Sequence, residues 1–111
     1  MDDKIRAGYL YDFYGELLNS HQREVFEMSI VDDLSLSEIA DELSISRQAV
    51  HDLIKRCDKS LEEYESKLHL VQKFMTIKDN ISIINDLTQG EPTEDTLKKI
   101  ASISNQILEE L

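Results

Sequence analysis

Residues that interrupt or cross-link a polypeptide are scarce in this sequence of 111 residues. It has one proline, three glycines and one cysteine, and no tryptophan. Because proline and glycine are the main helix breakers, so few of them leave room for long helices. The sequence also has no sustained alternation of apolar with β-branched residues, which would suggest strands. A single cysteine cannot form an internal disulfide bond. The sequence therefore predicts an all-α fold.

The sequence also lacks a long apolar run, a basic leader and an excess of positive charge. No apolar run approaches the roughly 18 residues that a membrane span needs, and the chain opens on the acidic pair Asp2 and Asp3. We therefore expect a cytoplasmic protein without membrane insertion. The formal net charge is −11, which opposes non-specific binding to a phosphate backbone. Any basic contact surface is expected to be small and local.

Apolar spacing and capping residues divide the chain into successive helices. Apolar side chains three and four residues apart predict a first helix over Ile5–Leu18, and Ser20 is a candidate cap for the second. Gly90 and Pro92 form the clearest stop signal in the sequence. A final amphipathic helix is expected to open at Thr93.

A helix-turn-helix motif has the clearest signature in the chain. Ser35 and Glu38 have the spacing of a capping box, and Ser46 can cap a second helix after a three-residue turn. The apolar positions expected inside the motif are Ala40, Ile45 and Val50. Together with Gln22–Phe26, the motif resembles region four of bacterial sigma-70-type factors. The expected fold is such a helix-turn-helix followed by a long central helix and a C-terminal helical extension.

Exposed side chains at the start of the second motif helix are the candidate contacts to a partner. They are Arg47, Gln48, Ala49, His51, Asp52 and Lys55. In a major groove, Arg47 would pair with guanine and Gln48 with adenine, each contributing about 1 to 3 kcal/mol of discrimination. Asp52, by contrast, would face phosphate or base acceptors at a cost. Nucleic-acid contact and protein binding both stay open.

Apolar residues recur every three or four positions from Val50 to Met75, as in a heptad repeat. The seam so defined includes Ile54, Cys57, Leu61, Tyr64, Leu68 and Val71. It predicts a long helix with one apolar stripe, and a homodimer with partial coverage by the later helices is the favoured interpretation. Parallel pairing, antiparallel pairing and coverage within the chain stay open. We expect a single helical domain over 1–111, with the helix-turn-helix core in 1–57 and the dimerisation region in 58–111.

Catalytic and metal-binding constellations are missing from the sequence. His21, His51 and His69 lie in three different segments, with no spacing that converges on a metal ion. Cys57 lies on the seam and is expected to be a buried hydrophobic residue. There is no glycine-rich phosphate loop and no pairing of a nucleophile with a base. We therefore predict a binding protein with no enzymatic activity and no cofactor.

The wider chain carries a further resemblance. The segment Tyr9–Leu18, the helix-turn-helix and the pair Lys73-Phe74 together resemble the YlxM-like family of low-GC Gram-positive bacteria, closely up to about Met75. The resemblance implies a small protein encoded beside signal recognition particle genes, with a regulatory or accessory role in that pathway. Its implied partners are the protein GTPases of the particle, its small RNA, or both. The family's motif residues correspond to Ser46, Arg47, Gln48, Val50 and His51, and it offers no catalytic residues.

Two other functions compete with this expectation. A sequence-specific transcriptional regulator would use Arg47, Gln48, His51 and Lys55 on DNA half-sites spaced by the dimer. A purely structural oligomerisation domain would bind no ligand through the motif.

Overall fold

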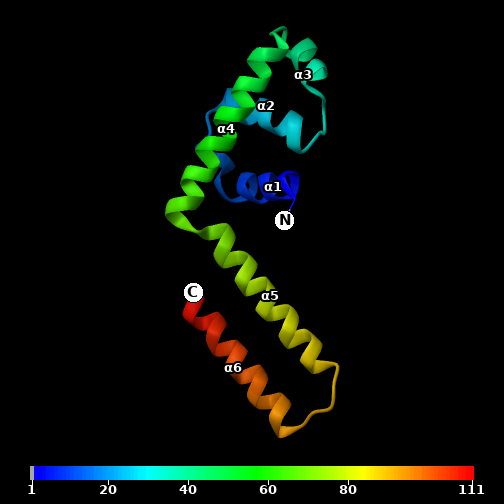
Figure 1. The fold of residues 1–111 in the computed structure, drawn as a ribbon, viewed down its shortest axis with the longest axis vertical. Helices are drawn as coiled ribbons and strands as arrows, with labels where there is room; N and C mark the ends of the chain where they lie inside the picture. Colours follow the sequence, from blue (N-terminus) through cyan, green and yellow to red (C-terminus); the bar gives the residue numbers. More distant parts are fainter. Residues whose placement is uncertain (1) are drawn as a thin grey trace. The chain divides into compact units, whose positions relative to one another are not determined.

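The computed structural model describes residues 2–111, and every regular element in that range is helical (Figure 1). In chain order the elements are α1 (Asp3–Tyr14), the 3-10 turn η1 (Gly15–Leu17), α2 (Ser20–Ile30), α3 (Leu36–Leu43), α4 (Arg47–Leu68), α5 (Leu70–Thr88) and α6 (Glu94–Glu110). The all-α prediction is confirmed. The chain divides into two compact units between His69 and Leu70. The sequence suggested a single domain with a subdivision after residue 57.

The first unit packs three short helices against α4. Helices α1, α2 and α3 each contact α4, and α2 also contacts α1 and α3. The helix-turn-helix has its own apolar core, in which Val25, Ile39, Ala40 and Val50 are buried. Ile45, in the turn, packs against this cluster. The roles predicted for Ala40, Ile45 and Val50 inside the motif therefore agree with their positions.

Helix α1 is held to the rest of the first unit by an ion pair and an aromatic stack. Arg6 donates two hydrogen bonds to the carboxylate of Glu62 on α4, at 2.7 and 2.8 Å. The ring of Tyr11 stacks on that of Phe26 on α2, with 5.4 Å between centroids. Gly15 makes room for Tyr11, because a Cβ at this position would lie 2.8 Å from the tyrosine ring. A side chain at Gly15 would therefore push Tyr11 out of place.

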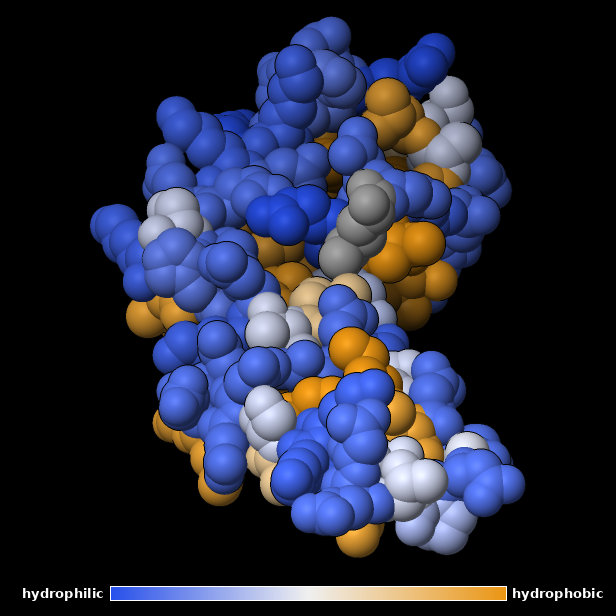
Figure 2. Space-filling view, turned by 60° about the horizontal axis from the view of Figure 1, so that its bottom comes forward, coloured by the Kyte–Doolittle hydropathy of each residue, from blue (hydrophilic) through white to orange (hydrophobic). Residues whose placement is uncertain are grey.

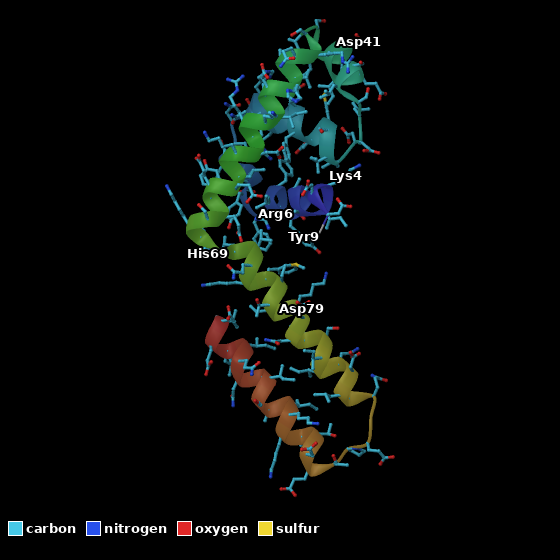
Figure 3. All side chains as sticks on the ribbon, viewed as in Figure 1. Lys4, Arg6, Tyr9, Asp41, His69 and Asp79 are labelled. Atoms are coloured by element: carbon cyan, nitrogen blue, oxygen red, sulfur yellow. The ribbon has the colours of Figure 1, made fainter. Side chains whose placement is uncertain are left out.

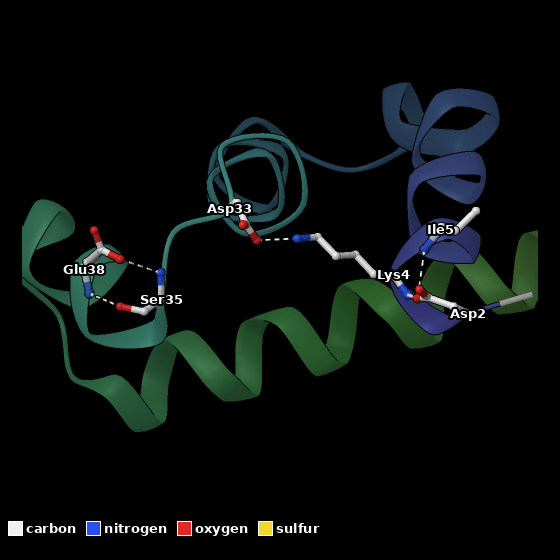
Figure 4. Close-up of polar contacts among 6 residues, drawn as sticks. All are labelled: Asp2, Lys4, Ile5, Asp33, Ser35 and Glu38. Atoms are coloured by element: carbon white, nitrogen blue, oxygen red, sulfur yellow. Dashed lines mark hydrogen bonds and ion pairs between the residues drawn. The ribbon is translucent and has the colours of Figure 1, made fainter.

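Side-chain caps fix where the helices begin (Figure 4). Ser35 accepts a hydrogen bond from the amide of Glu38, and Glu38 accepts one from the amide of Ser35, so the predicted capping box is confirmed. The cap of α2 is Asn19, which accepts from the Gln22 amide, so the prediction that Ser20 caps this helix was wrong by one residue. Figure 4 also shows the ion pair that joins Lys4 of α1 to Asp33, beyond the end of α2.

The expected long helix is divided at His69. This residue has a left-handed backbone, with φ of 56°, and it caps the C-terminus of α4. α5 begins at the next residue. The heptad spacing continues across the break, but the helix does not.

The second unit is a hairpin of two helices. In Figure 1, α5 and α6 lie side by side and run in opposite directions, and the two helices contact each other. The turn between them contains Gly90 and Pro92, as predicted. Thr93 caps α6 by accepting a hydrogen bond from the Thr96 amide over 3.1 Å, which confirms the predicted start of this helix.

Candidate functional site

The turn of the helix-turn-helix places the start of α4 beside α3. Ser44 has a left-handed backbone, with φ of 55°, and the amide of Ile45 returns to the carbonyl of Ala40 over 3.1 Å. Ser46 then caps α4 by accepting a hydrogen bond from the Ala49 amide over 3.0 Å, as predicted. Because hydrogen bonds join the turn to the end of α3 and to the start of α4, the first turns of α4 have a fixed position relative to α3.

The predicted contact residues lie on the outer side of α4. Its inner side is anchored by the fully buried Val50. Arg47, Gln48, Ala49, Asp52 and Lys55 are exposed, and His51 is partly buried. The structure thus brings all six predicted positions to the first three turns of one helix. We call these six residues the recognition face.

Polar contacts within the recognition face occupy two of its side chains. The Gln48 amide donates a hydrogen bond to Asp52 Oδ1 over 2.9 Å. The Nδ1 atom of His51 lies 3.6 Å from the same oxygen, which is beyond ordinary hydrogen-bond distance. Because Gln48 donates to its own helix, this amide is engaged and would have to release Asp52 before reading an adenine edge.

A shallow depression of about 390 Å³ lies between the starts of α3 and α4. It is lined by Leu36, Arg47, Gln48 and His51. Leu36 is only partly buried and gives the depression an apolar side chain. Sequence reasoning missed this because helical spacing does not show which edge of an apolar stripe remains open.

The neighbouring helix adds negative charge to this end of the first unit. Glu38, Asp41 and Glu42 of α3 are all exposed. Figure 3 shows Asp41 on α3 at the helix-turn-helix end of this unit. The cations of the recognition face therefore have several carboxylates nearby, including Asp52 of the face itself. This local charge suits a basic partner surface better than a phosphate backbone.

The predicted dimer seam is largely internal to the chain. Cys57 and Leu61 are fully buried within the chain, and Ile54 packs against the helix-turn-helix core. The ring of Tyr64 lies 6.0 Å from that of Tyr14 on α1. The apolar stripe of α4 is thus covered by α1 and α2, and a second copy is not needed to cover it.

The last two residues of the predicted seam differ from each other. Leu68 is 49% exposed in the last turn of α4, whereas Val71 is buried and belongs to α5. The six seam residues therefore divide between two helices and two units.

Cys57 behaves as the buried hydrophobic residue that the sequence indicated. Its side chain has no exposed area, and Sγ lies 3.9 Å from the carbonyl oxygen of Gln22. Burial raises the pKa of the thiol to about 11, because the thiolate would lose its hydration. Such a thiol is a poor nucleophile at neutral pH.

Within residues 2–111, the structure shows no group of three or more His, Cys, Asp or Glu side chains arranged to hold a metal ion. Over the same residues, no helix combines the length and apolar character that crossing a bilayer requires.

The capped turn, the buried anchor residues and the exposed first turns of α4 define a helix-turn-helix protein. Residues 1–103 match the family described as "UPF0122: Putative helix-turn-helix protein, YlxM / p13 like". The chain belongs to this family.

Relatives from Gram-positive genera match most of the chain. The UPF0122 protein YlxM of Bacillus subtilis (strain 168) is 41% identical over 97 residues, covering 87% of this chain and 88% of the relative. A UPF0122 protein of Clostridium kluyveri is 41% identical over 108 residues and covers 97% of each chain. One from Clostridium botulinum (strain Alaska E43 / Type E3) is 55% identical over 75 residues, covering 68% of this chain and 69% of the relative.

Proposed function

We propose that this protein is a regulatory or accessory binding protein of the signal recognition particle pathway, and that it binds a protein GTPase of that pathway through its helix-turn-helix. The main observation in favour of a protein partner is the hydrogen bond from the Gln48 amide to Asp52 within the recognition face. The pathway rests on the resemblance to the YlxM-like family.

The charge around the recognition face supports a protein partner over duplex DNA. A duplex placed against α4 would bring phosphates close to Asp52 and to the exposed carboxylates of α3, such as Asp41. Each such approach costs electrostatic energy, and few cations are present to offset it. A basic protein surface would instead gain from the same carboxylates.

The depression beside the recognition face supports the same choice. Leu36 offers an apolar contact, and Arg47 and His51 surround it with polar groups. A small apolar contact ringed by polar side chains is the usual composition of a protein interface. The area is small, so we expect a transient complex of modest affinity.

Binding to purified components tests the proposal. The labelled full-length chain is titrated at low salt with the particle GTPase, its receptor GTPase, the particle RNA and a random DNA duplex. We expect saturable binding to a GTPase, and a change in its rate of GTP hydrolysis. Binding to RNA alone or DNA alone, or to none of the four, would contradict the proposal.

Two matched substitutions separate the helix-turn-helix from general charge effects. Asp41→Lys reverses a charge on α3, and Asp79→Lys makes the same change on α5; both side chains are exposed (Figure 3). We expect Asp41→Lys to weaken binding about 10-fold or more, by placing like charges at the contact, and Asp79→Lys to change it little. Equal effects of the two variants would show that the helix-turn-helix is not the contact surface.

A sequence-specific DNA-binding regulator is the second candidate. It is favoured by the exposure of Arg47 and Lys55 on the first turns of a correctly capped second helix. This function predicts discrete genomic fragments in a selection experiment, and binding that weakens steeply with salt. Arg47→Ala would then lower the affinity for the selected site by about 5- to 100-fold, the loss of one good base contact.

A further inference from the structure

The hairpin of α5 and α6 leaves large apolar side chains in contact with water. Ile81 is 53% exposed, Leu97 is 61% exposed and Leu108 is 68% exposed. α6 has no buried residue along its whole length. Figure 2 shows apolar atoms at the surface of both units, among hydrophilic ones. The helices of the hairpin therefore gain little from burial within the chain.

Helical geometry places these exposed residues on one side of the hairpin. On α5, the partly buried Ile77 and Ile84 indicate the side toward α6, and on α6 the partly buried Ile103 and Ile107 indicate the side toward α5. At about 100° per residue, Ile81 lies roughly 50° further along the helical rotation than this side of α5, and the exposed apolar residues of α6 lie roughly 100 to 140° further than its corresponding side. Because the helices are antiparallel, rotations in the same sense lead to the same side of the hairpin.

We call this side the hairpin face and define it as Ile81, Leu97, Ala101 and Leu108. Its residues continue the heptad spacing of their helices. Ile77, Ile81 and Ile84 are separated by four and three residues on α5, and Leu97, Ala101, Ser104 and Leu108 by four, three and four on α6. This spacing is typical of helices that pack in a left-handed bundle.

On α6 the hairpin face lacks charge, whereas on α5 Lys78 lies on the same side of the hairpin as Ile81. The charged side chains of α6 fall on its outer and opposite sides, where Lys98 pairs with Glu94 and Lys99 with Asp95. The opposite side of the hairpin is polar, apart from Ile83. A mostly apolar face with one lysine offers little to a nucleic acid or to a strongly charged peptide, and resembles the central part of a protein interface.

We propose that the hairpin face binds the hairpin face of a second copy of this chain, so that two hairpins form a four-helix bundle. A twofold axis brings a surface onto itself, and an apolar stripe of Leu, Ile and Ala is complementary to itself under that operation. Bundles of this kind bury the a and d positions of their helices at the centre. Ile81 and Leu108 would occupy such positions.

The available area reaches what a stable dimer needs. Helices of 19 and 17 residues are about 26 to 28 Å long at 1.5 Å per residue, and two packed helices are about 20 Å wide. Pairing two such faces would remove roughly 1,000 Å² or more of surface from water, which is near the lower bound for a specific interface. The hairpin spans only 70–111, and units of about 40 residues commonly need an oligomeric partner for stability.

Sedimentation of the full-length protein between about 1 and 100 μM tests the proposal, since that range brackets dimers of moderate affinity. We expect a dimer that dissociates on dilution. Leu97→Glu and Leu108→Glu should each raise the dissociation constant at least 100-fold, since twofold symmetry buries two unpaired carboxylates for one substitution. Ile83→Glu, on the opposite side of the same hairpin, is the matched control and should leave the dissociation constant nearly unchanged.

Two further measurements distinguish loss of the dimer contact from loss of helix content in a variant. Circular dichroism at the highest concentration reports whether each variant retains its helices. Hydrogen exchange in the unmodified protein should show α6 amides becoming more protected as concentration rises. A monomer at every concentration, or a dimer that Ile83→Glu disrupts and Leu108→Glu does not, would overturn the proposal. Neither result bears on GTPase binding, which is measured separately.

Discussion

The Tyr14 hydroxyl donates a hydrogen bond to Glu65 Oε1 over 2.6 Å, and both side chains are buried. The bond joins the last residue of α1 to the last turns of α4, 51 positions later in the chain. A buried carboxylate depends on such donors, because water cannot replace them. Tyr14 thereby ties the amino-terminal helix to the long helix that carries the recognition face.

Replacing Tyr14 with Phe should destabilise the first unit by about 1 to 3 kcal/mol, because a buried carboxylate loses a donor. Urea unfolding followed by circular dichroism measures the loss. Tyr11→Phe is the matched control, since it removes a hydroxyl that donates to Glu27, whose carboxylate is exposed and can be rehydrated. Equal losses in the two variants would show that burial of Glu65 has no energetic consequence.

The Arg6–Glu62 pair should make stability depend on pH in the acidic range. The hydrogen bond from Arg6 lowers the pKa of Glu62 below its ordinary value of 4.5, against the opposing effect of burial. A carboxyl group with a lowered folded-state pKa stabilises the protein above its unfolded-state pKa, and this contribution is lost as pH falls. Both side chains are more than a third exposed, so solvent screening limits the contribution to about 0.2 to 1 kcal/mol.

Arg6→Gln tests this dependence when urea unfolding is compared at pH 7 and at pH 3. The variant should be less stable than the unmodified protein at pH 7, and the difference should shrink at pH 3. In a Glu62→Gln background, the same substitution should show no such pH dependence, which isolates the pair from other effects of Arg6. A difference that persists unchanged at pH 3 would show that Arg6 acts through packing.

Cys57 should resist thiol reagents in the folded protein. Its pKa of about 11, against an ordinary value of 9.0, lowers the thiolate fraction about 100-fold near pH 8, and its side chain is inaccessible. Labelling with a maleimide should therefore be at least about 100-fold slower than in concentrated urea. A Ser37→Cys, Cys57→Ala double variant provides an exposed thiol as control, and it should react quickly in the folded state. Rapid labelling of Cys57 would show that α4 opens readily.

The helix-turn-helix could be predicted because its determinants are local. Ser35 and Glu38 satisfy each other within one turn, and Ser46 needs only the amide of Ala49. Such contacts depend on spacing alone, so the sequence reveals them. The α2 cap was misplaced by one residue because Asn19 and Ser20 are adjacent and both are good capping residues.

The fate of the α4 stripe could not be predicted in the same way. A heptad pattern shows that Cys57 and Leu61 need to be covered, but the same spacing serves a second copy, α1 or α2 equally well. The break at His69 had no signal either, because neither glycine nor proline marks it, although histidine enters the left-handed region more often than most residues. The depression beside Leu36 and the hydrogen bond from Gln48 to Asp52 depend on helix packing and side-chain conformation, which residue spacing does not show.

Asp52→Lys should convert the recognition face toward binding of duplex DNA. The substitution removes the acceptor of the Gln48 amide and replaces a carboxylate by a cation on the same helix turn. At about 50 mM salt we expect affinity for a random duplex to rise about 10-fold, with the slope of log affinity against log salt steeper by up to about one. Fluorescence anisotropy over a series of salt concentrations measures both. Asp79→Lys makes the same charge change on α5 and should produce a smaller gain. If the two variants gain equally, the total charge of the chain, and not Asp52, is what opposes DNA binding.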